Sequence, residues 1–254
     1  MTADRTTVTL VTGASSGLGR ALALKLAAAG HWVVACARNQ GALWQLAEEP
    51  QAQGRILPVV LDITESAHIA AAVAMVQQRF ARLDTLVLNA GTCEYVDAAA
   101  PDLALFERVM QLNFHAQVAM VAAFQPLLQQ SAQPQVAIVS SLAHLFPFSR
   151  NQAYGASKAA LSYYADSLRV DLPWLHVLLI EPGFVDTPLT AQNNFDMPFL
   201  LTADDAAARM TTAITQRQLR CRFPRRLVAS LNLLRLLPYR IRQKVAAKLA
   251  GASR

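Results

Sequence analysis

Val8-Thr-Leu-Val-Thr-Gly-Ala-Ser-Ser-Gly-Leu-Gly19 is the stretch of sequence that decides the fold. An apolar run at 8–11 leads directly into three glycines, and an Ala/Leu-rich segment of helical length begins at residue 18. Glycines at a strand-to-helix junction let the backbone approach a ligand, and a helix start offers free N–H groups and a positive dipole end. The stretch predicts a phosphate-binding loop, although its G-x-x-x-G-x-G spacing differs from the common G-x-G-x-x-G fingerprint. A tight turn without a ligand is the alternative.

Apolar, β-branched runs recur along the chain and alternate with Ala/Leu-rich segments. The runs lie at 8–11, 32–37, 56–61, 85–88, 136–139 and 177–180, with a last strand near 219–223; the helical segments lie at 18–29, 66–80, 105–130 and 154–169. Continuous apolar strands that alternate with helices predict a Rossmann-type, doubly wound parallel α/β sheet of about seven strands with helices on both faces. The ligand site of such a sheet lies at the carboxyl ends of the strands. Gly30 is expected to end the first helix.

Composition excludes several classes of protein. The chain has 254 residues, of which 54% are hydrophobic and 16% charged, so it is neither disordered nor collagen-like nor a disulfide-stapled miniprotein. Three cysteines without a C-x-x-C pair predict no metal cluster and no disulfide framework, and they favour a reducing compartment. The polar residues 1–7 do not resemble a signal peptide. We therefore expect a cytoplasmic protein.

Charge is distributed unevenly. Residues 1–216 hold 12 Lys+Arg and 17 Asp+Glu, whereas residues 217–254 hold 11 Lys+Arg and no acidic residue. Apolar and basic residues alternate at helical spacing on both sides of Pro238, which predicts a basic helical extension at 224–254 after an α/β domain at 1–223. Three roles are open for this extension: peripheral contact with the inner membrane surface, docking of an acidic carrier protein, or packing on the body over the substrate cleft. Nucleic-acid binding is not expected, because Tyr239 is the only aromatic residue at 224–254 on which a base could stack.

Tyr154-Gly-Ala-Ser-Lys158 opens a predicted helix. Residues four apart share a helix face, so the Tyr154 hydroxyl and the Lys158 ammonium can serve one site. A nearby cation lowers the pKa of a tyrosine from about 10, which lets Tyr154 exchange a proton with a carbonyl oxygen or an alcohol. Ser141 at a strand end and Asn113, a lone polar residue in an uncharged stretch, count against the alternative of a surface Tyr–Lys pair.

The second strand ends at Ala37-Arg38-Asn39 without an acidic residue to bind the ribose 2′-hydroxyl of NAD. A guanidinium binds phosphate with two charge-assisted hydrogen bonds. Arg38 therefore predicts NADP(H) in preference to NAD(H), with a solvated surface arginine as the alternative.

The combined motifs resemble the short-chain dehydrogenase/reductase family over about residues 6–205. The resemblance rests on Thr12 to Gly19, Asp62-Ile63, Asn89-Ala90-Gly91, Asn113, Ser141, Tyr154 with Lys158, and Pro182-Gly183 followed by Thr187. It implies that Tyr154 is the general acid/base and that Lys158 binds the nicotinamide ribose and lowers the Tyr154 pKa. It further implies that Ser141 hydrogen-bonds the substrate carbonyl oxygen, and that Asn113 holds a helix kink and a water that passes protons to Lys158.

The resemblance also implies a set of cofactor-binding residues. They are Gly13, Ser15, Ser16, Gly17, Leu18, Gly19, Arg38, Asp62, Ile63, Asn89, Ala90, Gly91, Tyr154, Lys158, Pro182, Gly183, Val185 and Thr187. Asp62 is implied to reach the adenine amino group, and Asn89 and Gly91 are implied to line the adenosine ribose. Thr187 and the backbone near Val185 are implied to hold the nicotinamide amide. Ser15 and Arg38 match positions that hold the 2′-phosphate. The sequence departs from the family at Leu88, where an asparagine is usual, which puts local stability in doubt. It departs also at His144, where many members have glycine. His144 is either a second acid/base or a bystander in the pocket.

Two segments, 142–150 and 189–201, are expected to border the carbonyl site and line it with apolar side chains, the second within a substrate loop at about 186–205. Mutual packing of Phe146, Phe148, Phe195 and Phe199 is the alternative. These features predict an NADP(H)-dependent oxidoreductase that interconverts an apolar ketone or aldehyde and an alcohol. The alternatives are 3-oxoacyl reduction on a carrier and a non-catalytic, NADP-sensing protein. By resemblance, the uncharged helix packs against a second subunit in a homodimer or homotetramer.

Overall fold

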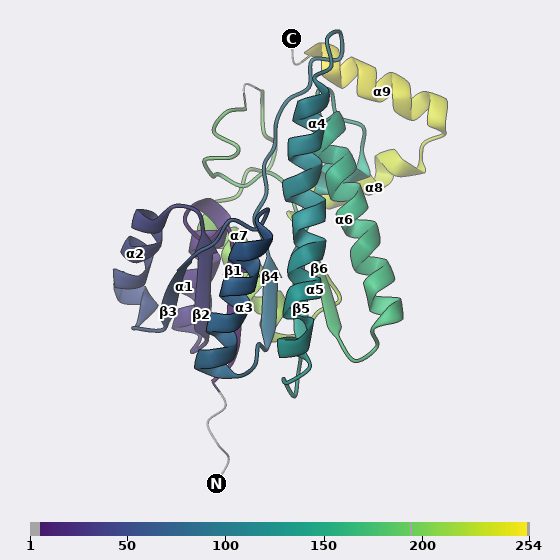
Figure 1. The fold of residues 1–254 in the computed structure, drawn as a ribbon. Coiled ribbons are helices and arrows are strands. Elements are labelled where there is room, and N and C mark those ends of the chain that lie inside the picture. Colours follow the sequence, from purple (N-terminus) through teal and green to yellow (C-terminus); the bar gives the residue numbers. More distant parts are fainter. Residues whose placement is uncertain (1–5, 194, 253–254) are drawn as a thin grey trace.

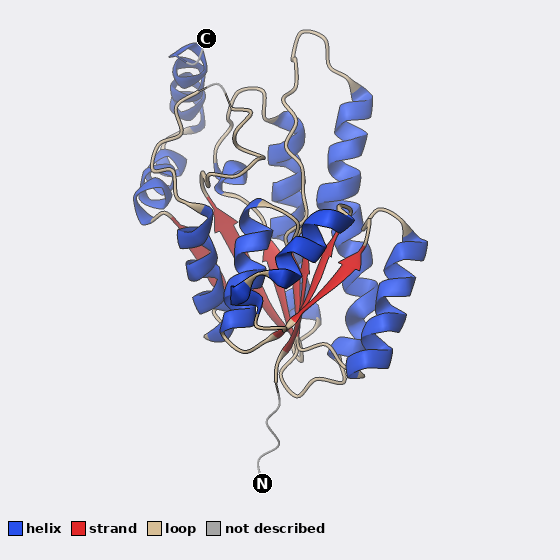
Figure 2. Ribbon diagram, turned by 90° about the vertical axis from the view of Figure 1, so that its left-hand side faces the viewer, coloured by secondary structure: helices blue, strands red, loops and turns tan. Residues whose placement is uncertain are grey.

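The computed structural model describes residues 6–193 and 195–252 and has a seven-stranded parallel sheet at its centre (Figures 1 and 2). The strands lie in the order β3-β2-β1-β4-β5-β6-β7. Their bounds are β1 Val8–Thr12, β2 Trp32–Ala37, β3 Ile56–Val60, β4 Thr85–Leu88, β5 Gln135–Val139, β6 His176–Pro182 and β7 Arg220–Phe223. The order runs outward in both directions from β1 and β4, so the predicted doubly wound sheet is confirmed, and a ligand crevice is expected where these two strands end.

Helices cover both faces of the sheet. Their bounds are α1 Gly17–Ala28, α2 Gln40–Glu48, α3 Ser66–Phe80, α4 Leu103–Met110, α5 Ala116–Leu128, α6 Gln152–Asp171, α7 Ala203–Thr215, α8 Arg225–Leu236 and α9 Tyr239–Ala252. One face packs against α1, α2 and α7, and the other against α3, α5 and α6. Because the strands are buried on both faces, their side chains form near-continuous apolar runs.

The first helix ends as the sequence predicts. Gly30 has a φ of +93°, its N–H donates to the Ala27 carbonyl at 2.9 Å, and the N–H of His31 donates to the Leu26 carbonyl at 3.0 Å. The left-handed residue is thus a glycine, which adopts this conformation at little cost.

Two helices, α2 and α7, were not among the predicted segments. The Asn39 side chain accepts a hydrogen bond from the N–H of Ala42 at 3.1 Å and starts α2, in which only Leu43 and Leu46 are buried. In the same way, Thr202 caps α7 through the N–H of Asp205 at 3.1 Å. Both helices begin at a capping side chain, and each buries one face in the core.

The segment predicted as one helix at 105–130 has three parts. A π-helical turn, Gln111–His115, separates α4 from α5. The turn holds Asn113, whose fully buried side chain hydrogen-bonds groups outside its own helix. π-helical turns occur frequently at functional sites, and this one directs a polar side chain from a helix interior toward the loop that follows β4.

The C-terminal helices extend the fold beyond the carboxyl ends of the strands (Figure 2). Leu227 and Leu231 of α8 are buried against Leu142, Leu145 and Phe146. In α9, Val245 and Ala246 are partly buried against the same cluster. No helix within the described ranges is both long and apolar enough to cross a membrane. The division into a domain at 1–223 and an extension at 224–254 stays a prediction.

Candidate active site

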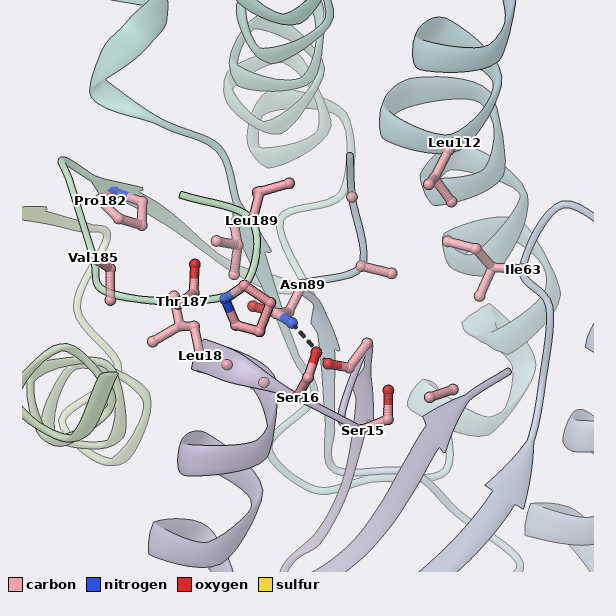
Figure 3. Close-up of a pocket in the computed structure, with 18 of the residues that line it drawn as sticks. Ser15, Ser16, Leu18, Ile63, Asn89, Leu112, Pro182, Val185, Thr187 and Leu189 are labelled. Carbon is pink, nitrogen blue, oxygen red and sulfur yellow. Dashed lines mark hydrogen bonds between the residues drawn. The ribbon is translucent and has the colours of Figure 1, made fainter. Parts of the chain in front are cut away.

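A cavity of about 420 Å³ lies at the carboxyl ends of the central strands (Figure 3). Every residue of the predicted cofactor-binding set lines it, and so does Ser141. Figure 3 shows Ile63 and Leu112 on one side of the cavity and Val185 and Thr187 on the other. The lining also includes residues that were not assigned to the site: Cys36, Ala37, Asn39, Leu61, Leu112, Val139, Ser140, Pro188, Leu189 and Thr190.

The glycine loop forms the base of this cavity and is closely folded. A Cβ built on Gly19 would lie 2.2 Å from the Gly13 carbonyl oxygen and 2.5 Å from Asn89 Nδ2, so no side chain fits there. Ser16 is the N-cap residue of α1, yet its side chain makes no capping hydrogen bond. The first N–H groups of a helix need a partner, and an anion satisfies both them and the helix dipole. The loop therefore fits a pyrophosphate.

Hydrogen bonds fasten the ends of β1 and β4 to one another. Thr12 Oγ1 accepts from the N–H groups of Asn89 at 2.9 Å and Ala90 at 3.0 Å, and Asn89 Nδ2 donates to the Thr12 carbonyl at 3.0 Å. Gln117 Nε2, on α5, donates to the Ala90 carbonyl at 2.8 Å. Gln117 was not assigned a positioning role from the sequence. Its place in the chain, four residues after Asn113, could have indicated that the two side chains share a helix face. Leu88 is buried in the core, so it contributes packing where an asparagine is usual.

Arg38 lies at the rim of the cavity, at the end of β2. Its Nη1 is 4.0 Å from Asp62 Oδ2, and the Arg38 side chain is 77% exposed. Asp62 Oδ1 accepts hydrogen bonds from Thr64 N at 3.0 Å and Thr64 Oγ1 at 2.7 Å. Burial opposes ionisation of Asp62, but the Thr64 hydrogen bonds and the Arg38 charge outweigh it and lower the pKa of this carboxyl. The guanidinium is thus held loosely by one carboxylate oxygen and remains accessible.

Ser141, Tyr154 and Lys158 come together where β5 ends and α6 begins. Tyr154 and Lys158 lie one helical turn apart, with Lys158 Nζ 5.8 Å from the centroid of the Tyr154 ring. Ser141 lines the same cavity as these two side chains, and its Oγ accepts a hydrogen bond from the N–H of Ala143 at 3.1 Å. Lys158 is buried, and its Nζ donates to the Val139 carbonyl at 2.9 Å. The predicted arrangement of these three side chains at one site is present.

The expected lowering of the Tyr154 pKa is not present in this structure. Burial raises the pKa of Tyr154 well above its ordinary value, and the hydrogen bond with Ser141 offsets only part of that increase. Burial also lowers the pKa of Lys158 to about 8, because desolvation disfavours the ammonium. The expectation was wrong because it counted the attraction between the two groups and left out the desolvation of both.

Asn113 lies behind the cavity and does not line it. Its Oδ1 accepts from Thr92 N at 2.8 Å, and its Nδ2 donates to the Thr92 carbonyl at 2.8 Å and to Ser157 Oγ at 3.0 Å. Ser157 Oγ in turn donates to the Tyr154 carbonyl at 2.8 Å. Asn113 therefore joins the loop after β4 to the first turn of α6 and acts as a positioning residue. Its implied role in proton transfer through a water stays a prediction.

Ser140 and Ser162 form a second connection between β5 and α6. Ser140 Oγ donates to the Lys158 carbonyl at 2.9 Å and lies 2.7 Å from Ser162 Oγ. Both side chains are buried. Sequence reasoning missed this pair, although Ser140 adjoins Ser141 and Ser162 follows Lys158 by four residues. The pair fixes the distance between the strand that carries Ser141 and the helix that carries Lys158.

The loop after β6 closes on itself beside the cavity. Val185 pairs with Leu201, and the N–H of Asp186 donates to the Leu201 carbonyl at 2.8 Å. Thr190 Oγ1 donates to the Val185 carbonyl at 2.5 Å and accepts from the N–H of Thr187 at 3.1 Å. The predicted substrate loop at 186–205 ends earlier, at Thr202, because α7 begins at residue 203.

Only one of the two apolar segments lines the cavity. Leu189, from the 189–201 segment, lines the cavity, whereas no residue of 142–150 does. Phe146 and Phe148 pack against each other with ring centroids 5.4 Å apart, and Phe146 is buried under α8. Phe195 contacts Tyr95 at 6.3 Å. α8 provides an apolar partner that covers part of 142–150, and the expectation that this segment borders the carbonyl site stays a prediction.

Comparison with known proteins identifies the family to which the chain belongs. The family model described as short chain dehydrogenase matches residues 7–198. The chain belongs to the short-chain dehydrogenase family. It is 37% identical over 232 residues to an uncharacterized oxidoreductase of Myxococcus xanthus, covering 90% of this chain and 92% of the relative. It is 33% identical over 187 residues to 11-beta-hydroxysteroid dehydrogenase A of Sesamum indicum, covering 72% of this chain and 53% of that relative, so it spans about half the length of the sesame protein.

Solved structures share the fold. A Pseudomonas aeruginosa RhlG/NADP active-site complex has 26% identity and a TM-score of 0.79, covering 85% of this chain and 94% of that one. A short-chain dehydrogenase/reductase from Burkholderia phymatum in complex with NAD has 23% identity and a TM-score of 0.82, covering 92% and 94%. This chain is thus an oxidoreductase of the short-chain dehydrogenase family, with the nucleotide-binding fold of its members.

His144, the departure of this short-chain dehydrogenase from the usual glycine, has a structural partner. His144 Nε2 lies 2.6 Å from Glu181 Oε1, and Glu181 is fully buried. Arg220 Nε and Arg222 Nε donate to Glu181 Oε2 at 2.5 and 2.7 Å. Burial alone would raise the pKa of Glu181, but the hydrogen bonds from His144, Arg222 and Arg220 lower it to about 2. His144 therefore ties the segment after Ser141 to β6 and β7.

Replacing this carboxylate is expected to destabilise the fold. In Glu181→Gln, two arginines lose a buried charged partner, so the free energy of unfolding should fall by about 3 kcal/mol at pH 7. The pKa of Glu181 falls from an ordinary 4.5 to about 2 on folding. Its stabilisation is therefore complete above the unfolded-state pKa and is lost as pH falls through the folded-state pKa.

Urea unfolding at a series of pH values measures this effect. The difference in stability between Glu181→Gln and the unmodified chain should shrink between about pH 4.5 and pH 2. Glu65→Gln removes an exposed carboxylate and serves as the control, with little change expected. A difference that is absent at pH 7, or that does not depend on pH, would contradict the role assigned to Glu181.

Proposed function

We propose that this chain is an NADP(H)-dependent oxidoreductase that interconverts an apolar ketone or aldehyde and the corresponding alcohol by hydride transfer, with Tyr154 as general acid/base. The observation that carries this proposal is the convergence of Ser141, Tyr154 and Lys158 on the same cavity as the glycine loop. Oxidoreductases among the relatives support the reaction type. The proposal places the enzyme in the cytoplasm with a small-molecule substrate.

The cavity has separate places for binding and for proton transfer. The glycine loop and the ends of β2, β4 and β6 would hold the dinucleotide, which supplies or accepts the hydride when bound. Tyr154 donates its hydroxyl proton to a carbonyl oxygen, or accepts one from an alcohol, while Ser141 donates a hydrogen bond to the same oxygen. Lys158, charged below a pKa of about 8, favours the phenolate that remains after donation. Leu189 gives the site an apolar side chain.

A substrate panel tests the reaction. Ketones, aldehydes and secondary alcohols of increasing apolar size should be assayed with NADPH, NADH and their oxidised forms. We expect turnover of apolar carbonyl compounds with NADPH. Turnover confined to carrier-linked 3-oxoacyl groups would replace this proposal by the carrier reaction, and cofactor binding without turnover of any member would replace it by a sensing role.

The preference for NADP(H) rests on Arg38. Its guanidinium is exposed at the end of β2, and the Asn39 side chain next to it is engaged in capping α2. The neighbouring carboxylate, Asp62, is 4.0 Å from the guanidinium and therefore binds it only weakly. The RhlG/NADP complex among the solved relatives supports this choice, whereas another relative is in complex with NAD.

Arg38→Ala should weaken NADPH binding and leave NADH binding nearly unchanged. Loss of a charge-assisted phosphate contact costs about 1.5–3 kcal/mol, which corresponds to a rise of about 10- to 150-fold in the Kd for NADPH. Titration calorimetry or cofactor fluorescence measures both constants. Arg209→Ala, which removes an exposed arginine on α7, is the control. Equal affinity of the unmodified chain for NADPH and NADH would contradict the preference.

We also propose that the enzyme is a homodimer or homotetramer. On α6, Tyr163 and Val170 are strongly exposed to solvent. Exposed apolar side chains of this size on a packed helix favour contact with a second subunit.

A further inference from the structure

The inner face of α8 is fixed by its packing. Leu227 and Leu231, one helical turn apart, are buried against the segment that follows Ser141. The contact is close, because a Cβ built on Gly183 would lie 2.7 Å from Leu227 Cδ2. The buried side of α8 is thus defined, and so is the side that faces away from the body.

The opposite side of α8 carries apolar and basic residues. Arg225, Ala229, Leu233 and Leu236 follow one another at spacings of four and three, which places them along one helix face. Leu233 is 67% exposed and Leu236 is 82% exposed, and Arg226 is exposed beside them. We call these five residues the α8 outer face. Two leucines this exposed on a helix that already has a buried face are not needed for folding.

The neighbouring helix adds positive charge. Arg240, Lys244 and Lys248 follow at spacings of four along α9, and all three are exposed. Within residues 6–193 and 195–252, the basic side chains of α8 and α9 take part in no ion pair. In the sequence, residues 217–254 contain no Asp or Glu. Both helices lie beyond the carboxyl ends of the strands (Figures 1 and 2), so this charge is concentrated at one end of the molecule.

We propose that the α8 outer face, together with the basic row of α9, docks on the surface of an anionic lipid bilayer. Exposed leucines enter the boundary between headgroups and acyl chains, while arginine and lysine side chains extend to the lipid phosphates. A second copy of the same face would not supply the missing negative charge, because residues 217–254 contain no Asp or Glu. An acidic partner protein would neutralise the basic side chains, but it would not account for the exposure of Leu233 and Leu236.

Docking would bring the cavity end of the enzyme to the membrane. α8 packs directly on Leu142 and Leu145, which follow Ser141, so the bilayer would lie next to the elements that carry the candidate active site. An apolar substrate could then reach the cavity from the lipid phase. Binding itself does not depend on the proposed reaction and is tested without it.

Sedimentation of the full chain with sucrose-loaded vesicles tests the proposal. We expect binding to phosphatidylcholine vesicles that contain phosphatidylglycerol, weak binding to pure phosphatidylcholine, and a loss of binding as salt rises from low to molar concentration. The double variant Leu233→Ser/Leu236→Ser should bind about tenfold or more weakly. Leu103→Ser is the matched control, because Leu103 on α4 is 71% exposed and lies outside the α8 outer face.

A second pair of variants tests the charges. Arg225→Gln/Arg226→Gln should weaken binding and reduce its dependence on salt, whereas Arg209→Gln on α7 should do neither. Thermal unfolding followed by circular dichroism checks that each variant remains folded. No binding of the unmodified chain to anionic vesicles at low salt would overturn the proposal, as would equal binding by the double leucine variant and Leu103→Ser. Capture by an acidic protein without vesicle binding would also overturn it.

Discussion

Tyr154→Phe is expected to lower kcat by about 10²- to 10⁴-fold, the usual contribution of a positioned general acid or base. The phenylalanine keeps the ring in its place on α6 and removes only the hydroxyl group. Cofactor affinity should stay within about threefold, because the glycine loop and Arg38 are untouched. Stopped-flow or steady-state assays on a good substrate, with cofactor titration on the same samples, separate the two quantities.

Tyr163→Phe is the matched control for this substitution. It removes a phenolic hydroxyl from the same helix, but Tyr163 is strongly exposed and does not line the cavity. It should leave both kcat and cofactor affinity unchanged. If Tyr154→Phe retained nearly normal kcat, Tyr154 would not be the acid/base and the proposed reaction would need another proton donor.

Gly19→Ala is expected to abolish measurable cofactor binding, with a rise in Kd of about 100-fold or more. The added Cβ would lie 2.2 Å from the Gly13 carbonyl oxygen. Neither atom can move by a side-chain rotation, because the Cβ is fixed to the backbone and the oxygen belongs to it. The loop must therefore move away from the position in which its N–H groups surround the cavity. Overpacking of this kind also costs about 1–3 kcal/mol of stability, which thermal unfolding measures.

Gly41→Ala provides the comparison within the same fold. A Cβ at Gly41, near the start of α2, would meet nothing closer than Asn39 Oδ1 at 3.7 Å. We expect stability to change by less than about 1 kcal/mol and cofactor affinity to remain normal. Unimpaired cofactor binding by Gly19→Ala would show that the glycine loop is only a tight turn.

The sequence alone determined the sheet and the positions of the main site residues. Continuous apolar runs such as 32–37 and 136–139 can be satisfied only by burial on both faces, which requires a parallel sheet with two helix layers. The spacing of Tyr154 and Lys158 places both on one face of any helix that contains them. These features are local, because they depend on periodicity and on residues next to one another in the chain.

Tertiary structure decided the features that depend on distant partners. Asn113 joins the loop after β4 to the first turn of α6, because its side chain hydrogen-bonds Thr92 and Ser157. His144 and Glu181 are 37 residues apart in sequence and meet only because β6 ends beside the segment that follows Ser141. No periodicity encodes such a pairing.

The pKa of Tyr154 is the clearest case in which the folded environment reversed an expectation from the sequence. Spacing places a lysine beside this tyrosine and by itself predicts a lowered pKa. Folding desolvates both groups, which raises the pKa of Tyr154 and lowers the pKa of Lys158. The sequence thus determined which groups meet at the site. Only the tertiary structure decided the direction in which each pKa moves, because desolvation depends on everything packed around a group and not on its neighbours along the chain.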